Sequence, residues 1–239
     1  MLSSLASAVG GVKNTATAAA GAVHGGVSKA VDSLSVEEIV AALKEALNAA
    51  AERAVACVSA VDGFMGNPSI RVPMPDDIAR ATSILGKIPG ISGKVDEFLL
   101  AMNRAAEMAA AAAVPIFLIA IRDLTLQKAK ELLVSKTPTA ATQHFDASCR
   151  PSLYALFLPI VVQKMQDCGV VRVFDEIADA MGKVPIVGRR PTLDVGNHVT
   201  TKALDGLFLV IGQQETKIRT DKTSRVTPLM DKVFSCAEQ

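Results

Sequence analysis

Apolar side chains recur at the spacing of an α-helix along most of this 239-residue chain, and this pattern constrains its fold most strongly. The first such stripe follows Ser35 and Glu38, whose three-residue separation is that of a capping box at a helix start. The stripe consists of Val36, Val40, Leu43, Leu47, Ala51, Ala54 and Val58. These signals predict a helix that ends near Ser59 and buries one face.

Comparable signals predict further helices that begin near Asp76, Val95, Thr125, Thr137, Val170, Val195 and Thr227. Pro115 either kinks the helix after Val95 or starts a new one. Pro151 and Pro159 interrupt an otherwise apolar stretch, and residues 87–94 and 184–191 are predicted to be turns or loops. No segment has a persuasive strand pattern.

The composition agrees with closely packed helices. Hydrophobic residues make up 50% of the chain but aromatic residues only 4%, so the core is built mainly from Ala, Leu, Val and Ile. We therefore expect an all-α, multi-helix bundle of roughly eight to ten helices.

The first 34 residues carry a different pattern, in which small apolar side chains return every eleven positions. Eleven residues make almost three helical turns, so three rows share one face: Leu5, Ala16 and Val27; Val9, Ala20 and Val31; Val12, Val23 and Leu34. Five glycines oppose a free helix in water, at about 1 kcal/mol each. Residues 1–34 are thus expected to form an amphipathic leader before a helical domain of residues 35–239. The leader is either a flexible segment, a helix on a lipid surface or partner, or a helix docked on its own core.

Charge and cysteine usage exclude several classes of function. A net charge of +1 and few aromatic side chains argue against a nucleic-acid partner. The cysteines form no CxxC pair and the histidines no ligand spacing, so we expect free thiols, no metal site and no cofactor. The residues concerned are Cys57, Cys149, Cys168, Cys236, His24, His144 and His198.

The sequence also predicts where the chain resides. Residues 1–31 lack the basic start and compact Leu-rich run of a secretory signal. The longest uncharged stretch, residues 108–121, is shorter than the roughly 20 residues of a spanning helix. We expect a cytoplasmic or organelle-interior protein, peripheral to a membrane if the leader binds lipid.

Two predicted regions carry polar side chains of interest. Residues 62–76 form a connector rich in Gly and Pro, in which Asn67 suits a turn before Pro68 and Arg71 suits a carboxylate or phosphate. Structural anchoring is the alternative for both side chains. The alternation at Ile70 and Val72 permits a short extended piece.

On the helix after Val95, the spacing of Asn103, Arg104 and Glu107 lets their side chains converge. They either orient a ligand head group or form a structural polar network. Lys202 and Asp205 are similarly spaced on a later helix, where an ion pair is the alternative to a ligand-binding or proton-transfer couple.

Six sequence blocks resemble, in order, the helical domain of unknown function 4197 family. These are DGFMGNPSIRVPMP, MNRAAEMA, PIFLIAIRDLTLQKAKELL, AATQHF, VTTKALDGLFLVIGQQETKIR and LMDKVF. The resemblance spans about residues 35–235 and implies a helical fold without an assigned reaction. The family is mostly bacterial and typically carries an export signal, which we do not recognise here. His144 replaces a family Tyr, and Lys128 stands where an acid is common.

No reaction signature appears in the sequence, since it has no G-x-S-x-G elbow and no phosphate loop with the right spacing. We therefore expect a non-catalytic protein that binds an apolar ligand or a lipid surface. Phe117 and Phe208, with Met102 and Leu156, are candidates to line a hydrophobic cavity, with ordinary core as the alternative. The second hypothesis is a structural, self-assembling protein whose leader packs on a neighbouring copy. An enzyme that uses Glu107 or Asp205 is the third.

Overall fold

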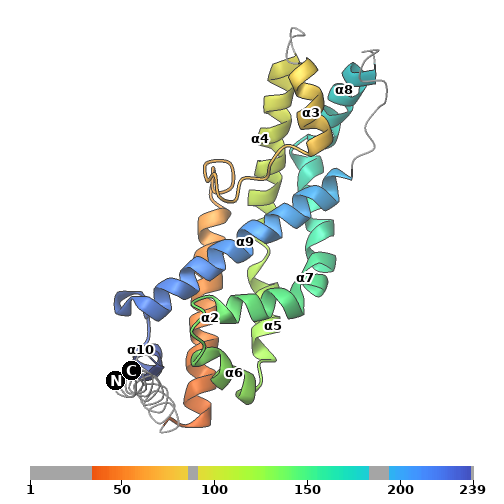
Figure 1. Ribbon diagram of the computed structural model, residues 1–239. Helices are drawn as coiled ribbons and strands as arrows, with labels where there is room; N and C mark the ends of the chain where they lie inside the picture. Colours follow the sequence, from red (N-terminus) through yellow and green to blue (C-terminus); the bar gives the residue numbers. More distant parts are fainter. Residues whose placement is uncertain (1–33, 86–90, 183–193, 238–239) are drawn as a thin grey trace, which may run out of the picture.

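The computed structural model describes residues 34–85, 91–182 and 194–237, which form helices and no strand (Figure 1). The expectations for residues 1–33 and for the loop at residues 184–191 lie outside this described part. The helices are α2 (Val36–Val58), α3 (Asp76–Leu85), α4 (Ile91–Ala110), α5 (Val114–Arg122), α6 (Leu126–Leu133), α7 (Ala140–Asp167), α8 (Val170–Gly182), α9 (Val195–Thr220), the 3-10 helix η1 (Lys222–Ser224) and α10 (Pro228–Ala237). The predicted all-α, multi-helix fold is confirmed.

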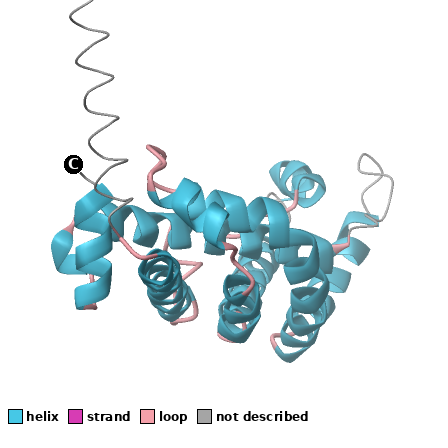
Figure 2. Ribbon diagram, turned by 90° about the horizontal axis from the view of Figure 1, so that it is seen from below, coloured by secondary structure: helices cyan, strands magenta, loops and turns pink. Residues whose placement is uncertain are grey.

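Helix α9 organises the arrangement because it crosses and contacts α2, α4 and α7 (Figure 1). Helices α3 and α8 pack on α4 at one end of the molecule, whereas α6 and α10 pack on α2 at the other. Seen from below, the upright helices of Figure 1 form a row, and α9 crosses one side of that row (Figure 2).

Local sequence signals explain where several helices begin. Ser35 and Glu38 form the predicted capping box, with Glu38 N donating to Ser35 Oγ at 3.1 Å and Ser35 N donating to Glu38 Oε2 at 2.9 Å. Thr227 Oγ1 accepts a hydrogen bond from Met230 N and so caps α10. Pro115 lies in the first turn of α5, and the break before it bends the chain by 47° relative to α4.

Two elements differ from the prediction. Helix α4 already begins at Ile91, so residues 91–94 are helical rather than part of a turn. Helix α7 continues through Pro151 and Pro159. Each proline removes a hydrogen bond to the carbonyl four residues earlier, at Ala147 and Ala155. Both alanines are exposed, so water can hydrate the freed carbonyls.

Small residues let the helices approach closely. The buried face of α2 includes Ala42, Ala46, Ala50 and Ala54. On α9, a Cβ atom at Gly206 would lie 2.9 Å from both Ile70 Cβ and Phe64 Cε1. Gly206 is therefore the position at which the connector packs against α9.

Candidate functional site

Asn103 on α4 is fully buried and binds the backbone of the connector. Its Oδ1 accepts from Val72 N at 2.9 Å, and its Nδ2 donates to Val72 O at 3.1 Å and to Leu99 O at 2.8 Å. The side-chain amide thus satisfies both backbone groups of Val72, in a stretch that forms no strand. Its polar atoms are satisfied by backbone groups.

Glu107 holds the start of the connector in a similar way. Its Oε1 accepts from Phe64 N at 3.1 Å and Met65 N at 3.2 Å, and its Oε2 accepts from Arg104 at 2.7 Å. Arg104 also binds Asp62, a non-glycine residue with a φ of 66°. The hydrogen bonds to Glu107 and then Asp62 raise the pKa of Arg104. Arg104 and Glu107 therefore form a network that fastens the start of the connector to α4, whereas Asn103 holds Val72 separately.

Asn67 and Arg71 shape the connector itself. Asn67 Oδ1 accepts from Ser69 N at 3.1 Å, as an Asx turn requires. Arg71 Nε donates to Met65 O at 2.7 Å, which holds the side chain across the turn. The rest of the Arg71 side chain lines a hollow between the connector and α9.

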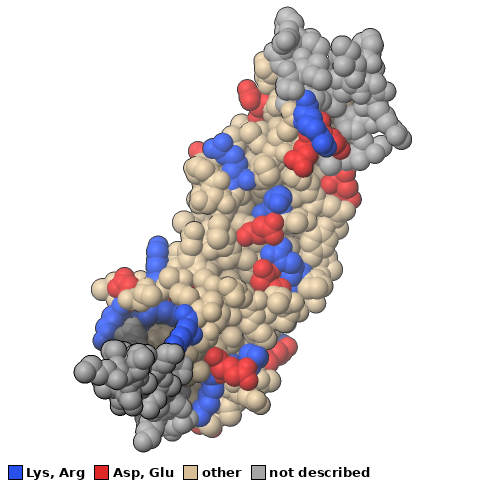
Figure 3. Space-filling view, in the orientation of Figure 1, with Lys and Arg blue, Asp and Glu red and all other residues tan. Residues whose placement is uncertain are grey.

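Lys202 and Asp205 lie on α9 beside an arginine that the sequence analysis did not single out. Arg150 on α7 donates to Asp205 Oδ1 at 2.7 Å and to both carboxylate oxygens of Asp146, at 2.5 and 3.1 Å. Hydrogen bonds with Asp146 and then Asp205 raise the pKa of Arg150, against the opposing effect of burial. Lys202 Nζ lies farther away, 3.6 Å from Asp205 Oδ2. Figure 3 shows acidic and basic side chains adjacent to one another along this face.

Phe208 and Phe117 lie beneath this ion-pair group. Their rings pack edge to face with 5.4 Å between the ring centres. The Arg150 guanidinium lies 5.3 Å from the centre of the Phe208 ring. The apolar gap at these two rings has a volume of about 10 Å³. This is room for no more than one water molecule, so these side chains pack here as core.

Two larger depressions flank α9. A cleft of about 370 Å³ lies between α7 and α9 and is bordered by Thr139, Gln143, Asp146, Arg150, Asp205 and Gln213. A hollow of about 340 Å³ lies on the connector side and is bordered by Arg71, Lys202 and Asp205. Asp205 therefore separates the two depressions.

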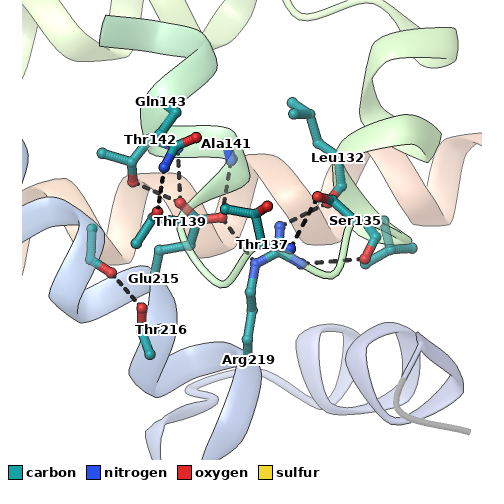
Figure 4. A network of polar contacts seen from close by, with 12 residues as sticks. Leu132, Ser135, Thr137, Thr139, Ala141, Thr142, Gln143, Glu215, Thr216 and Arg219 are labelled. Carbon is teal, nitrogen blue, oxygen red and sulfur yellow. Dashed lines mark hydrogen bonds and ion pairs between the residues drawn. The ribbon is translucent and has the colours of Figure 1, made fainter.

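A buried pair at the far end of α9 was not predicted from the sequence. Glu215 accepts from Ala141 N, Thr142 N and the Thr142 hydroxyl at 2.6–3.0 Å (Figure 4). Arg219 binds Glu215 and donates to the carbonyls of Leu132 and Leu133. The pair therefore caps the start of α7 and the end of α6. Its only sequence signal is the four-residue spacing of opposite charges.

The exposed face of α7 is uncharged over residues 151–163. Residues 151–163 contain no charged side chain, and Leu156 and Val162 are 54% and 39% exposed. By length and composition alone α7 is able to span a membrane, as are α4 and α5 taken together, and only 22% of the apolar window of α7 is buried. Four exposed apolar residues of this segment, Ala155, Leu156, Pro159 and Val162, are called the strip below.

The titratable side chains outside these networks do not form a metal centre. In the described ranges, no group of three His, Cys, Asp or Glu residues is arranged to hold a metal ion. Burial raises the pKa of Cys168, whose Sγ lies 3.5 Å from Met108 Sδ. Burial likewise lowers the pKa of His144, and the positive charge of Lys128 adds to this effect.

Comparison with known proteins identifies the family. No curated protein and no solved structure matches the chain. The model of a family described as Protein of unknown function (DUF4197) matches residues 33–235. This match includes all the helices described above except the last two residues of α10. The chain therefore belongs to the DUF4197 family.

Proposed function

We propose that this chain is a non-catalytic protein that docks on a lipid surface through the outer strip of α7. The observation that carries the proposal is the strip itself, in which Leu156 and Val162 face outward from an uncharged segment. Moving one such side chain from water into an apolar layer is worth about 1.5–3 kcal/mol. Two side chains support reversible contact only, so the leader is proposed as the second contact.

The internal packing favours a surface over an enclosed apolar ligand. The gap at Phe117 and Phe208 has a volume of only about 10 Å³. An acyl chain or other apolar ligand would require these side chains to repack, which is costly in a close-packed core. Binding of the exposed strip to a lipid surface needs no such rearrangement.

The charges beside the strip indicate what kind of membrane it suits. Arg150 is bound by Asp146 and Asp205, and Lys164 is 3.2 Å from Asp167. Basic side chains that are already paired add little attraction to anionic lipid. Docking through the strip is therefore expected to depend on apolar contact and to proceed on neutral vesicles.

Vesicle flotation of the full chain tests this proposal. Wild-type protein is expected to float with phosphatidylcholine vesicles, and adding phosphatidylserine is expected to change the floating fraction little. The double variant Leu156→Gln and Val162→Gln should lose most of this binding. A second variant, Val12→Gln and Val23→Gln, should weaken it if the leader is the second contact.

The matched control places the same change on other exposed positions. Val171 and Val226 are 50% and 58% exposed and lie away from the strip in sequence. Val171→Gln and Val226→Gln together should leave flotation unchanged. Equal flotation of the strip variant and this control would show that α7 is not the docking face.

A further inference from the structure

The hollow between the connector and α9 brings together two basic side chains and a hydroxyl group. It has a volume of about 340 Å³, and Ser69, Arg71 and Lys202 line it, with Asp205 and Gly206 on the α9 side. The segments that form it are held rigidly. Asn103 fixes Val72, and Gly206 packs against Ile70 without room for a Cβ atom.

Arg71 is oriented for an external partner. Its Nε is held by Met65 O at 2.7 Å, which limits the directions that the guanidinium can take. Its Nη1 and Nη2 groups have no hydrogen-bond partner among the described residues, and neither does the Ser69 hydroxyl. A guanidinium edge with two unused amino groups matches the spacing of two oxygens on one phosphate.

Lys202 is also available, because Arg150 neutralises its nearest carboxylate. Asp205 Oδ1 is 2.7 Å from Arg150, whereas Asp205 Oδ2 is 3.6 Å from Lys202. If Lys202 turned to an incoming anion, Asp205 would keep its arginine partner. Within the hollow, Arg71 and Lys202 outnumber the single acid Asp205, so its lining carries a net positive charge.

Two other lining residues, Pro73 and Gly206, do not block the approach of an anion. Pro73 O, on the same connector, is already 2.8 Å from His198 Nε2. Gly206 adds no side chain to the floor of the hollow. The size of the hollow suits a small anionic group with part of the molecule that carries it.

We propose that this hollow binds a phosphate monoester group, held by Arg71 through two N–H donors, by Lys202 through its ammonium and by the Ser69 hydroxyl. Two cations and a hydroxyl favour a doubly charged phosphate over a singly charged carboxylate. The proposal does not rest on lipid docking, since the hollow and the strip of α7 share no residue.

The direct test titrates the full chain with inorganic phosphate at constant ionic strength, followed by backbone amide NMR shifts. Saturable shifts are expected at Ser69, Arg71 and Gly206, with acetate binding more weakly. Arg71→Gln should raise the dissociation constant at least about tenfold, and Lys202→Gln several-fold. Arg71→Lys keeps the charge but loses the paired donors, so it should bind less tightly than wild type while remaining folded.

Two controls make the result decisive. Arg122→Gln removes a cation from α5 and should leave the phosphate titration unchanged. The strip variant Leu156→Gln and Val162→Gln should also bind phosphate normally, so failure of this proposal is separable from failure of lipid docking. Shifts that do not saturate, or that survive in Arg71→Gln, would overturn the site.

A vesicle-binding measurement distinguishes a lipid headgroup from a soluble phosphate ester as the source of the phosphate. Phosphatidylcholine vesicles containing phosphatidic acid present a phosphate monoester, whereas those containing phosphatidylglycerol present only a diester. Arg71-dependent binding to phosphatidic acid, released by inorganic phosphate, would identify a lipid headgroup as the ligand. Saturable binding of free phosphate without Arg71-dependent vesicle binding would identify a soluble phosphate ester.

Discussion

At the scale of single residues, buried polar side chains on α4 hold an irregular connector in one conformation. The connector contains Gly63 and Gly66, where a Cβ atom would lie within 2.7 Å of backbone oxygens. Such a segment has no helix or sheet to satisfy its own backbone groups. Asn103 and Glu107 provide the missing partners, and this explains why both are buried despite being polar.

The contribution of Asn103 is testable by one substitution. Asn103→Ala leaves the buried Val72 N–H and C=O groups without partners, and each unsatisfied group costs about 1–3 kcal/mol. We expect the free energy of unfolding in urea to fall by about 2–4 kcal/mol. Asn67→Ala is the control, because it removes only one exposed hydrogen bond and should cost less than about 1 kcal/mol. Similar losses for both variants would contradict the role assigned to Asn103.

At the scale of elements, α9 ties other helices together through side chains as well as packing. The connector packs against Gly206, and Asp205 binds Arg150 of α7. Glu215 and Arg219 together cap the start of α7 and the end of α6. Arg219 also lies 5.8 Å from the Phe234 ring of α10. One face of α9 is therefore committed to structure, whereas Lys202 and Asp205 lie at its half-exposed edge.

Removing the cap from α7 should be far more damaging than removing an ordinary surface acid. Glu215→Ala leaves three donors of residues 141–142 unsatisfied and Arg219 without its carboxylate, for an expected loss of about 3–5 kcal/mol. Glu131→Ala breaks only an exposed pair with Lys128 and should cost about 0.5 kcal/mol or less. Urea unfolding measures both values. A loss below about 1 kcal/mol for Glu215→Ala would show that water replaces the cap.

At the scale of the whole molecule, an elongated helical assembly has acidic and basic side chains close together along one face (Figure 3), and it carries an uncharged strip on α7. The strip offers two large exposed side chains, whereas a stable protein interface buries roughly 800 Å² on each partner. This small area is our reason for proposing lipid, and not a second copy, as the occupant of this face.

Sedimentation velocity separates lipid docking from self-assembly. In the absence of lipid, the full chain is expected to sediment as one species whose mass does not change on dilution. A mass that rises with concentration, and that falls again in Leu156→Gln with Val162→Gln, would assign the strip to self-association. If the mass rises with concentration and the double variant Val12→Gln and Val23→Gln abolishes that rise, the result would support a leader that packs on a neighbouring copy.

Features encoded by neighbouring residues could be predicted from the sequence. The capping box at Ser35 and the start of α10 after Thr227 depend on groups within a few positions of one another. So does the break at Pro115, for which the sequence left a kink and a new helix open. The same holds for the apolar stripes that indicated an all-α fold. Helix formation is governed by such local hydrogen bonds and side-chain periodicity, so sequence alone determines most of the element order.

Only the tertiary structure decided which side chains meet. Arg150 and Asp205 are 55 positions apart, and Glu215 lies 73 positions from Thr142. The uninterrupted course of α7 through two prolines likewise depends on which of its carbonyls face water. Side-chain spacing on one helix shows which groups share a face, but it does not show what packs against that face. Which segment packs against a given helix face depends on burial and hydrogen bonding over the whole chain. Each polar group that this packing buries needs a hydrogen-bond partner, and that partner can come from a distant part of the sequence.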